Sequence, residues 1–297
     1  MAIHGYVCLS KDYWPVKDKY IRLWDIGLDW AHMNPARGVY DFSVLEAVLS
    51  AHPGTNFMLT LSGTPQWAAT NPAETGWASW IGPASNSPPK DLVDWDNFLV
   101  AVVTAARGRI SSYQIWNEPT AVPFWKDIAT IDRLGVMTLR AKTIIKARAP
   151  KASIVSAPVL PRNSTLGVPG MNRGSKYLQA LKHYDWPVDI HTAHIYPEIG
   201  FMPARWRYYV QDWKDELKRL AAPNCPLWVT ETTYNLLGGA MPDAAIAQRI
   251  PATDQAANDL SVARVYWYAY GVHGDPSVLG IPFQSTGAGT TTLAKFQ

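Results

Sequence analysis

The 297-residue sequence predicts an α/β fold, a single-domain (β/α)8 TIM barrel over residues 1–297. Eight short apolar runs rich in β-branched and aromatic residues recur along the chain, and helical patterns separate most of them. Strands that alternate with helices form a parallel sheet. Eight such units in one chain favour closure into a barrel over an open sheet.

The predicted elements follow one another in this order. The strands are Ile3–Cys8, Tyr20–Asp25, Asn56–Leu61, Ser111–Asn117, Ser153–Ala157, Val188–His194, Leu227–Glu231 and Arg264–Tyr268. The helices are Ser43–Ala51, Leu92–Arg107, Ile131–Arg148, Lys176–His183, Ala204–Leu220 and Asp243–Leu260. We expect a short first unit, because only Ser10–Lys19 separates the first two strands, and a poor last helix in Gly287–Gln297.

Composition excludes several classes of function. Hydrophobic residues make up 47% of the chain, enough to bury a large core. The net charge of +3 is small and the basic residues are scattered, so we expect neither a nucleic-acid partner nor binding to an anionic membrane. No apolar run reaches the roughly 20 residues of a membrane span, and no signal-peptide pattern is visible.

The aromatic content is high, with 14 Trp and 14 Tyr. We expect about half of these residues in the core and the others on a surface that stacks on flat, weakly polar ligands such as sugars. The longest predicted loop, Gly63–Asp91, carries Trp67, Trp77 and Trp80. A loop of this length inside one domain is usually functional. We therefore expect either a sugar platform among these tryptophans, with Trp67 as a substrate-binding candidate, or a loop that packs on itself.

Two glutamates lie at the carboxyl ends of predicted strands. Glu118 follows the fourth strand in Trp-Asn-Glu-Pro, and Glu231 ends the seventh strand in Trp-Val-Thr-Glu. Charged residues at such strand ends of a barrel are typical of catalysis, although either glutamate could instead form a salt bridge at the rim. Strands four and seven lie across the barrel from each other, so the two carboxyl groups can flank one sugar.

The two glutamates are expected to differ in protonation state and in role. A retaining glycosidase holds its two carboxyl groups about 5 Å apart, one protonated and one ionised. We expect polar neighbours to keep Glu231 ionised. We expect burial and a nearby negative charge to raise the pKa of Glu118, so that it serves as the acid.

Several segments resemble clan A retaining glycoside hydrolases, and within the clan glycoside hydrolase family 39 and its endoglycosidase-like relatives. Trp116–Pro119 followed by Phe124-Trp125 resembles the acid/base segment of that family. The other segments that carry the resemblance are Arg22–Asp25, Asn34–Phe42, Thr64–Ala68, His194–Pro197, Trp228–Glu231 and Tyr266–Tyr268. The resemblance spans roughly Tyr20 to Tyr270, but Thr120 stands where the family often has Asn, and no accessory β-domain is visible.

The resemblance implies roles for the site residues. Glu118 would be the acid/base and Glu231 the nucleophile. The implied supporting roles are these: Asn117 binds the sugar 2-hydroxyl, Arg22 holds Glu231 ionised, Tyr196 donates to Glu231, His194 contacts the substrate or the acid/base, and Trp267 forms the floor beneath the sugar. Asp25 is a further candidate that either lines the mouth of the barrel or packs beneath it. Arg22 could also be a core residue paired with Asp25.

The predicted activity is therefore that of a retaining O-glycoside hydrolase acting on a polysaccharide or oligosaccharide, in an endo fashion. The alternatives are an exo-acting, xylosidase-like β-glycosidase, a transglycosylase that uses the same site, and a non-catalytic carbohydrate-binding barrel. We expect a monomer with no cofactor and no metal. His191 and His194 are three residues apart on a strand and point to opposite faces, which argues against a shared metal ion.

Overall fold

Eight parallel strands form one sheet in the computed structural model, which describes residues 2–5, 20–161, 173–197, 204–232 and 243–270. The strands are β1 (Ala2–Gly5), β2 (Tyr20–Leu23), β3 (Asn56–Leu61), β4 (Ile110–Ile115), β5 (Ser153–Val155), β6 (His191–Ile195), β7 (Leu227–Thr232) and β8 (Val262–Tyr270). They pair in the order β5-β4-β3-β2-β1-β8-β7-β6. Each of the eight predicted strands thus has a counterpart in the sheet.

The two ends of this order, β5 and β6, meet and close the barrel. Isolated parallel bridges join Val155 to Ile190 and Val159 to Ala193. The backbone N–H of His194 also donates to the carbonyl of Val159 at 2.9 Å. The predicted (β/α)8 barrel is confirmed. In this fold the carboxyl ends of all strands lie at one face, so residues from strands far apart in the sequence lie close together there.

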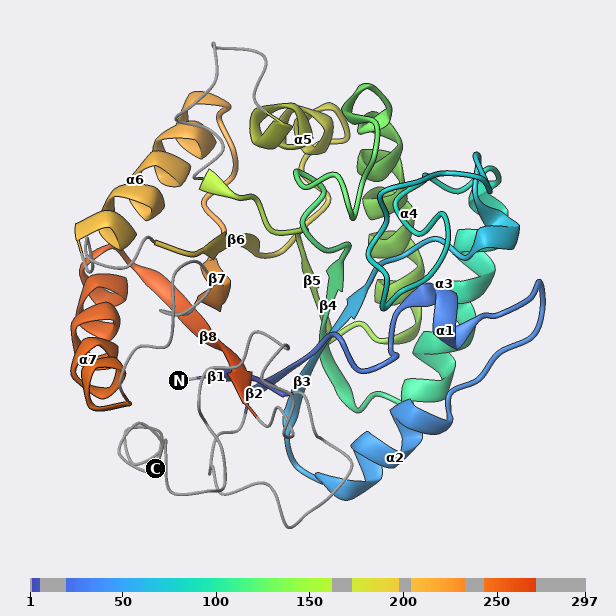
Figure 1. Ribbon diagram of the computed structural model, residues 1–297, viewed down its shortest axis with the longest axis horizontal. Coiled ribbons are helices and arrows are strands. Elements are labelled where there is room, and N and C mark those ends of the chain that lie inside the picture. Colours follow the sequence, from blue (N-terminus) through green and yellow to red (C-terminus); the bar gives the residue numbers. More distant parts are fainter. Residues whose placement is uncertain (1, 6–19, 162–172, 198–203, 233–242, 271–297) are drawn as a thin grey trace.

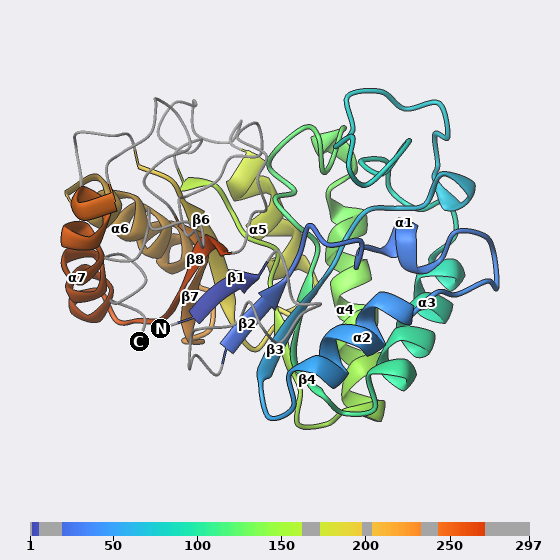
Figure 2. The same cartoon turned by 60° about the horizontal axis from the view of Figure 1, so that its bottom comes forward.

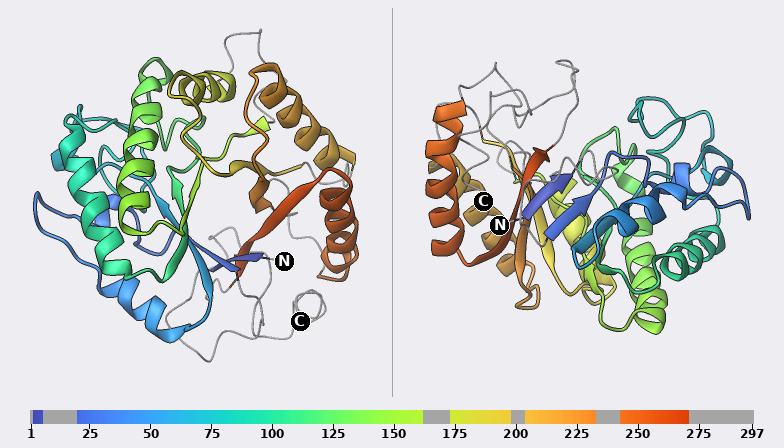
Figure 3. Two further views of the ribbon diagram at one scale, coloured as in Figure 1. Left: turned by 180° about the vertical axis from the view of Figure 1, so that it is seen from behind. Right: turned by 90° about the horizontal axis from the view of Figure 1, so that it is seen from below.

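Helices surround the barrel on the outside (Figure 1 and Figure 3). They are α1 (Trp30–Met33), α2 (Ser43–Ala51), α3 (Leu92–Ala106), α4 (Asp132–Arg148), α5 (Arg173–His183), α6 (Ala204–Arg219) and α7 (Asp243–Asp259). Two 3₁₀ turns, Gln66–Ala68 and Ile128–Thr130, lie in the loops after β3 and β4. All six predicted helices are present, with ends within three residues of the predicted ones. The four-residue α1, which Asp29 caps, was not predicted.

Two strand predictions ran too far at the site. The structure ends β2 at Leu23 rather than Asp25, and β4 at Ile115 rather than Asn117. In each case a residue with positive φ follows the strand, namely Asp25 at 62° and Trp116 at 80°. Such backbone conformations are rare for residues other than glycine and cannot continue a strand.

Most of the described tryptophans are buried. The buried ones are Trp24, Trp30, Trp95, Trp116, Trp125, Trp186, Trp206, Trp213, Trp228 and Trp267. Among the described tryptophans, only Trp80 is an exposed residue, at 55%. The expectation that about half of the aromatic residues serve a ligand surface is therefore wrong for tryptophan, because the space between sheet and helices takes up most of these large side chains.

Several predictions lie outside the described residues. These are the short first unit at Ser10–Lys19, the last helix at Gly287–Gln297 and the end of the first predicted strand. The described residues form one barrel, which is consistent with the single predicted domain. None of their helices combines the length and apolar character needed to cross a membrane.

Candidate active site

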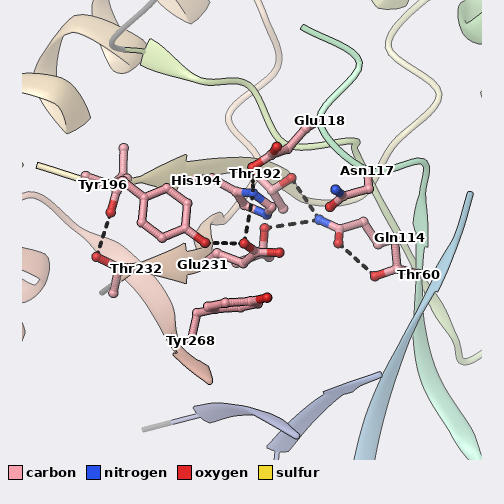
Figure 4. Close-up of polar contacts among 12 residues, drawn as sticks. Thr60, Gln114, Asn117, Glu118, Thr192, His194, Tyr196, Glu231, Thr232 and Tyr268 are labelled. Carbon is pink, nitrogen blue, oxygen red and sulfur yellow. Dashed lines mark hydrogen bonds and ion pairs between the residues drawn. The ribbon is translucent and has the colours of Figure 1, made fainter. Parts of the chain in front are cut away.

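The two predicted glutamates come together at the carboxyl ends of β4 and β7. Glu118 lies three residues beyond β4, and Glu231 lies in β7, where it pairs with His194 of β6. Oxygen atoms of the two carboxyl groups and a ring nitrogen of His194 all lie within 4.8 Å of one another. Figure 4 shows the side chains of these three residues pointing toward one another.

Glu231 is surrounded by donors. Nη1 of Arg22 donates to its Oε1, and the hydroxyl of Tyr196 donates to its Oε2. Only 7% of the Glu231 side chain is exposed, and the Arg22 side chain is fully buried. Such a buried ion pair depends on its additional hydrogen bonds, because both charges have lost their contact with water.

Arg22 is held on all three guanidinium nitrogens. Besides the contact with Glu231, Nη2 donates to Oδ1 of Asn117 at 2.8 Å, and Nε donates to Oε1 of Gln114 at 2.8 Å. A guanidinium fixed in this way presents one nitrogen to the carboxylate in a set direction. Arg22 therefore ties Glu231 of β7 to Asn117, the residue next to Glu118.

Gln114, which we did not predict, anchors Arg22 from below. Its Oε1 also accepts from Thr60 at 3.0 Å, and its Nε2 donates to the hydroxyls of Thr192 at 3.2 Å and Thr230 at 3.1 Å. The fully buried amide thus links strands from both sides of the barrel (Figure 4). The signal that could have revealed it is a large polar side chain in the middle of an otherwise buried strand.

The surroundings of Glu118 are different. Its Oε1 lies 2.6 Å from Nδ1 of His194, which lies 3.5 Å from Oε2 of Glu231. Burial raises the pKa of Glu118 to about 7, and the positive charge of Arg22 opposes this rise. Burial lowers the pKa of His194 to about 3, so the ring is neutral near pH 7. The expected rise in the pKa of Glu118 thus has burial as its cause.

The neutral ring of His194 constrains the proton of Glu118. A neutral imidazole has one N–H, and Nδ1 faces two carboxyl oxygens, so Nδ1 carries the hydrogen. Oε1 of Glu118 then accepts this hydrogen bond. A proton on Glu118 therefore resides on the other oxygen, Oε2.

One face of β6 and the residue directly after this strand supply three contacts of the site. Thr192, His194 and Tyr196 alternate along the chain, and they contact Gln114, Glu118 and Glu231 respectively. Alternation is expected because successive side chains of a strand point to opposite faces. His191 lies on the other face, and its ring packs edge-on against Trp186 at 5.4 Å.

The backbone around Glu118 is unusual. Trp116 and Glu118 both have positive φ, 80° and 35°. The backbone N–H of Trp116 donates to Leu61 at 2.8 Å, and its indole donates to the carbonyl of Phe124 at 2.8 Å. Strained residues persist where the surroundings fix them, and each costs roughly 1–3 kcal/mol. This bend turns the chain so that Asn117 and Glu118 leave the strand at the barrel mouth.

Of two further candidates, Asp25 joins the cluster through Tyr268 of β8, whereas Trp267 lies in the core. Asp25 accepts from the hydroxyl of Tyr268 at 3.0 Å, and the ring of Tyr268 lies edge-on to Tyr196 at 6.5 Å. Trp267 is 1% exposed, belongs to the hydrophobic core and pairs with Thr232 in the sheet. Tyr268 is a second residue that we did not predict, since its role depends on the partner that another strand brings to it.

Trp67 lies away from the glutamates. Its indole donates to the carbonyl of Asn34 at 2.8 Å, and the guanidinium of Arg37 lies 5.6 Å from its ring. Within the described part of the chain, no hydrogen bond or ring contact joins Trp67 to Glu118 or Glu231. Trp67 thus contacts the segment after β2 rather than residues of its own loop.

The same cluster contains the only described group of residues that could hold a metal ion, namely Glu118, His194 and Glu231. Their ligand atoms are engaged with one another and with Arg22 and Tyr196. The positive charge of Arg22 already compensates one carboxylate. The expectation that the site works without a metal stays a prediction.

Comparison with known proteins relates this arrangement to others. No family model matches the chain. A β-xylosidase from Geobacillus stearothermophilus is 23% identical over 252 residues, which cover 76% of this chain and 45% of that protein. A solved glucosidase from Croceicoccus marinus has a TM-score of 0.69 at 15% identity, covering 94% of this chain and 61% of that one. A GH39 β-xylosidase from Caulobacter crescentus has a TM-score of 0.60 at 22% identity, covering 85% and 55%.

The chain thus spans about half the length of the β-xylosidases that it matches, 45% of one and 55% of the other. The similarity is spread over nearly the whole described barrel, although few residues are identical. What these likenesses show is the fold: this chain is a (β/α)8 barrel of the kind found in glycosidases of known structure.

Proposed function

We propose that the chain is a clan A glycoside hydrolase related to family 39, which cleaves O-glycosidic bonds of a polysaccharide or oligosaccharide with retention of configuration. The observation that carries this proposal is the approach of Glu118 and Glu231, whose carboxyl oxygens lie within 4.8 Å. Retaining enzymes hold their carboxyl groups about 5–5.5 Å apart, whereas inverting enzymes need about 6.5–9.5 Å to admit a water molecule.

In the first step Glu231 is the nucleophile. Its carboxylate attacks the anomeric carbon, the glycosidic C–O bond breaks, and the proton of Glu118 passes to the departing oxygen. The products are a glycosyl ester on Glu231 and a free sugar hydroxyl. Arg22 and Tyr196 orient the carboxylate for this attack, because each donates to one of its oxygens.

In the second step Glu118 is the base. It takes a proton from water, the water oxygen attacks the anomeric carbon, and the ester bond to Glu231 breaks. A group that gives and takes a proton works best with a pKa near the working pH, and burial raises the pKa of Glu118 to about 7. The hydrogen bond from His194 leaves Oε2 of Glu118 as the atom that exchanges this proton.

The remaining site residues bind the sugar. Asn117, oriented by Arg22, contacts the 2-hydroxyl beside the nucleophile. Asp25 and Tyr268 lie at the same mouth. The floor role that the resemblance implies for Trp267 is not retained, because its side chain is 1% exposed and belongs to the hydrophobic core. The substrate class is a β-linked polysaccharide or oligosaccharide, in keeping with the xylosidase and glucosidase names of the relatives, and cleavage is endo.

The test is a panel of β-1,4- and β-1,3-linked hexasaccharides of xylose, glucose, mannose and galactose. Mass spectrometry of the products separates internal cleavage from removal of single terminal sugars, and also detects longer products made by transglycosylation. NMR of the first product formed gives its configuration. Initial release of the inverted anomer would rule out the retaining mechanism. Binding without any cleavage across the panel would favour a carbohydrate-binding barrel.

A further inference from the structure

Trp80 differs from the other described tryptophans because more than half of its surface, 55%, is exposed. It lies in the segment between β3 and α3, which rises beside the loop after β4 (Figure 2). An exposed indole leaves a large apolar surface in water, which forgoes the free energy that burial of this surface would contribute. The question is what holds this ring in place and what it faces.

The ring of Trp80 rests on an aromatic base. Its centroid lies 6.1 Å from that of Phe124, edge to face, and Phe124 makes the same kind of contact with Trp24 at 6.1 Å. Trp24 and Phe124 are buried in a small apolar cluster with Ala78 and Ile81. The guanidinium of Arg22 lies 5.9 Å from the Trp24 ring, so ring contacts lead from Trp80 back to the catalytic cluster.

Hydrogen bonds fix the Trp80 segment to the loop that carries Glu118. The backbone N–H of Ala78 donates to Pro123 at 3.3 Å, and the amide of Asn86 donates to the carbonyl of Val122 at 3.1 Å. The backbone N–H of Lys126 in turn donates to Asn86 at 2.8 Å. The position of Trp80 is therefore set relative to Glu118 by main-chain contacts as well as by ring packing.

The neighbourhood of Glu118 identifies the side of the scissile bond. The inference rests on the proposed function, in which Glu118 donates its proton to the departing sugar. The loop after Glu118 then flanks that sugar. Val122 in this loop is also exposed, at 43%. The C–H face of a pyranose is complementary to the negative face of an aromatic ring.

We infer that Trp80, supported by Phe124, is a stacking platform for a pyranose unit on the leaving-group side of the cleaved bond. The ligand class is the departing portion of an oligosaccharide or polysaccharide. A platform on this side favours internal cleavage, because it contributes binding energy only when several sugars follow the bond.

The test compares two substrates of the same sugar. One is the hexasaccharide that the wild type cleaves fastest, and the other is the corresponding disaccharide glycosyl fluoride, whose leaving group is too small to reach Trp80. For Trp80→Ala we expect kcat/KM on the hexasaccharide to fall about tenfold, the size of one lost aromatic contact, with the fluoride unchanged. The cleavage positions in the hexasaccharide should shift toward shorter leaving groups.

Matched variants make the outcome specific. Tyr208→Ala removes another exposed aromatic ring, 49% exposed on α6, and should leave both substrates unaffected. Trp80→Phe keeps an aromatic face and should recover most of the loss. The inference would be overturned if Trp80→Ala lowered kcat/KM equally on both substrates. It would also be overturned if the variant changed neither kcat/KM nor the cleavage positions. Both outcomes would leave the proposed function intact. A wild type that cleaves neither substrate would instead overturn the proposed function.

Discussion

Glu231 and Glu118 approach within 4.8 Å, yet their surroundings are opposite. Glu231 receives a hydrogen bond from a buried guanidinium and another from a phenol. Glu118 receives one from a neutral imidazole and keeps 16% of its side chain exposed. In the proposed mechanism these surroundings separate two chemically identical side chains: Arg22 and Tyr196 orient Glu231 as the nucleophile, and burial raises the pKa of Glu118, the acid.

Removing the nucleophile should have the largest effect. Glu231→Gln keeps the size of the side chain but abolishes the attacking carboxylate, so kcat/KM should fall about 10⁴-fold or more. The measurement is the initial rate on the best hexasaccharide. Glu216→Gln, which removes a carboxylate paired with Arg219 on α6, is the matched control and should change little. If Glu231→Gln kept more than about one-hundredth of the wild-type kcat/KM, the assignment of Glu231 as the nucleophile would be contradicted.

Removing the acid should cost less and should depend on the leaving group. Glu118→Ala should lower kcat/KM on oligosaccharides about 10²–10⁴-fold, because the departing sugar then leaves without a proton. A glycosyl fluoride needs little acid assistance, so formation of its glycosyl ester should remain fast. Azide, which needs no base, should restore turnover and give a glycosyl azide of the same configuration as the substrate. An azide product of inverted configuration would reverse the roles of the two glutamates.

Tyr196→Phe tests the hydrogen bond from the Tyr196 hydroxyl to Glu231. The variant removes one donor to Oε2 and leaves the guanidinium in place, so kcat should fall about 10²-fold. Tyr208→Phe on α6 is the control for loss of a tyrosine hydroxyl. If Tyr196→Phe changes KM alone, this hydroxyl binds substrate and does not act through the nucleophile.

The pH profile tests how Arg22 acts on Glu118 and should show the smallest effect. Glu118 must be protonated in the first step, and burial raises its pKa to about 7, so activity should fall as the pH rises through about 7. Arg22 holds this pKa down, so Arg22→Met should move the falling limb to higher pH, and Arg22→Lys should leave it close to the wild-type position. Arg140→Met, which breaks a surface pair with Asp96, should not move it. A limb that stays in place in Arg22→Met would show that Arg22 exerts no such effect.

The sequence predicts the barrel well because the periodic patterns that define strands and helices are local. The positions of Glu118 and Glu231 could also be predicted from the sequence, since a charged residue at the end of a buried strand has few structural explanations. The ends of β2 at Leu23 and of β4 at Ile115 could not be predicted, because the positive φ at Asp25 and Trp116 depends on the tertiary contacts that hold these residues.

The supporting network was harder to predict. Gln114 acts through Arg22, Thr60, Thr192 and Thr230, which come from four other strands, and only the closed barrel brings them together. The many tryptophans suggested a wide sugar-binding surface, but most of them fill the core. Composition cannot separate these two uses of an indole, whereas exposure in the folded chain singles out Trp80.

The bond between Arg22 and Glu231 joins residues 209 positions apart, and this separation has a consequence for biosynthesis. A ribosome delivers the arginine long before its counter-charge. Until β7 arrives, a nascent chain that buried Arg22 would hold an uncompensated charge, which is strongly unfavourable. We therefore expect the incomplete barrel to keep Arg22 in contact with water. Closure of the barrel and pairing of Arg22 with Glu231 would then occur together, late in synthesis.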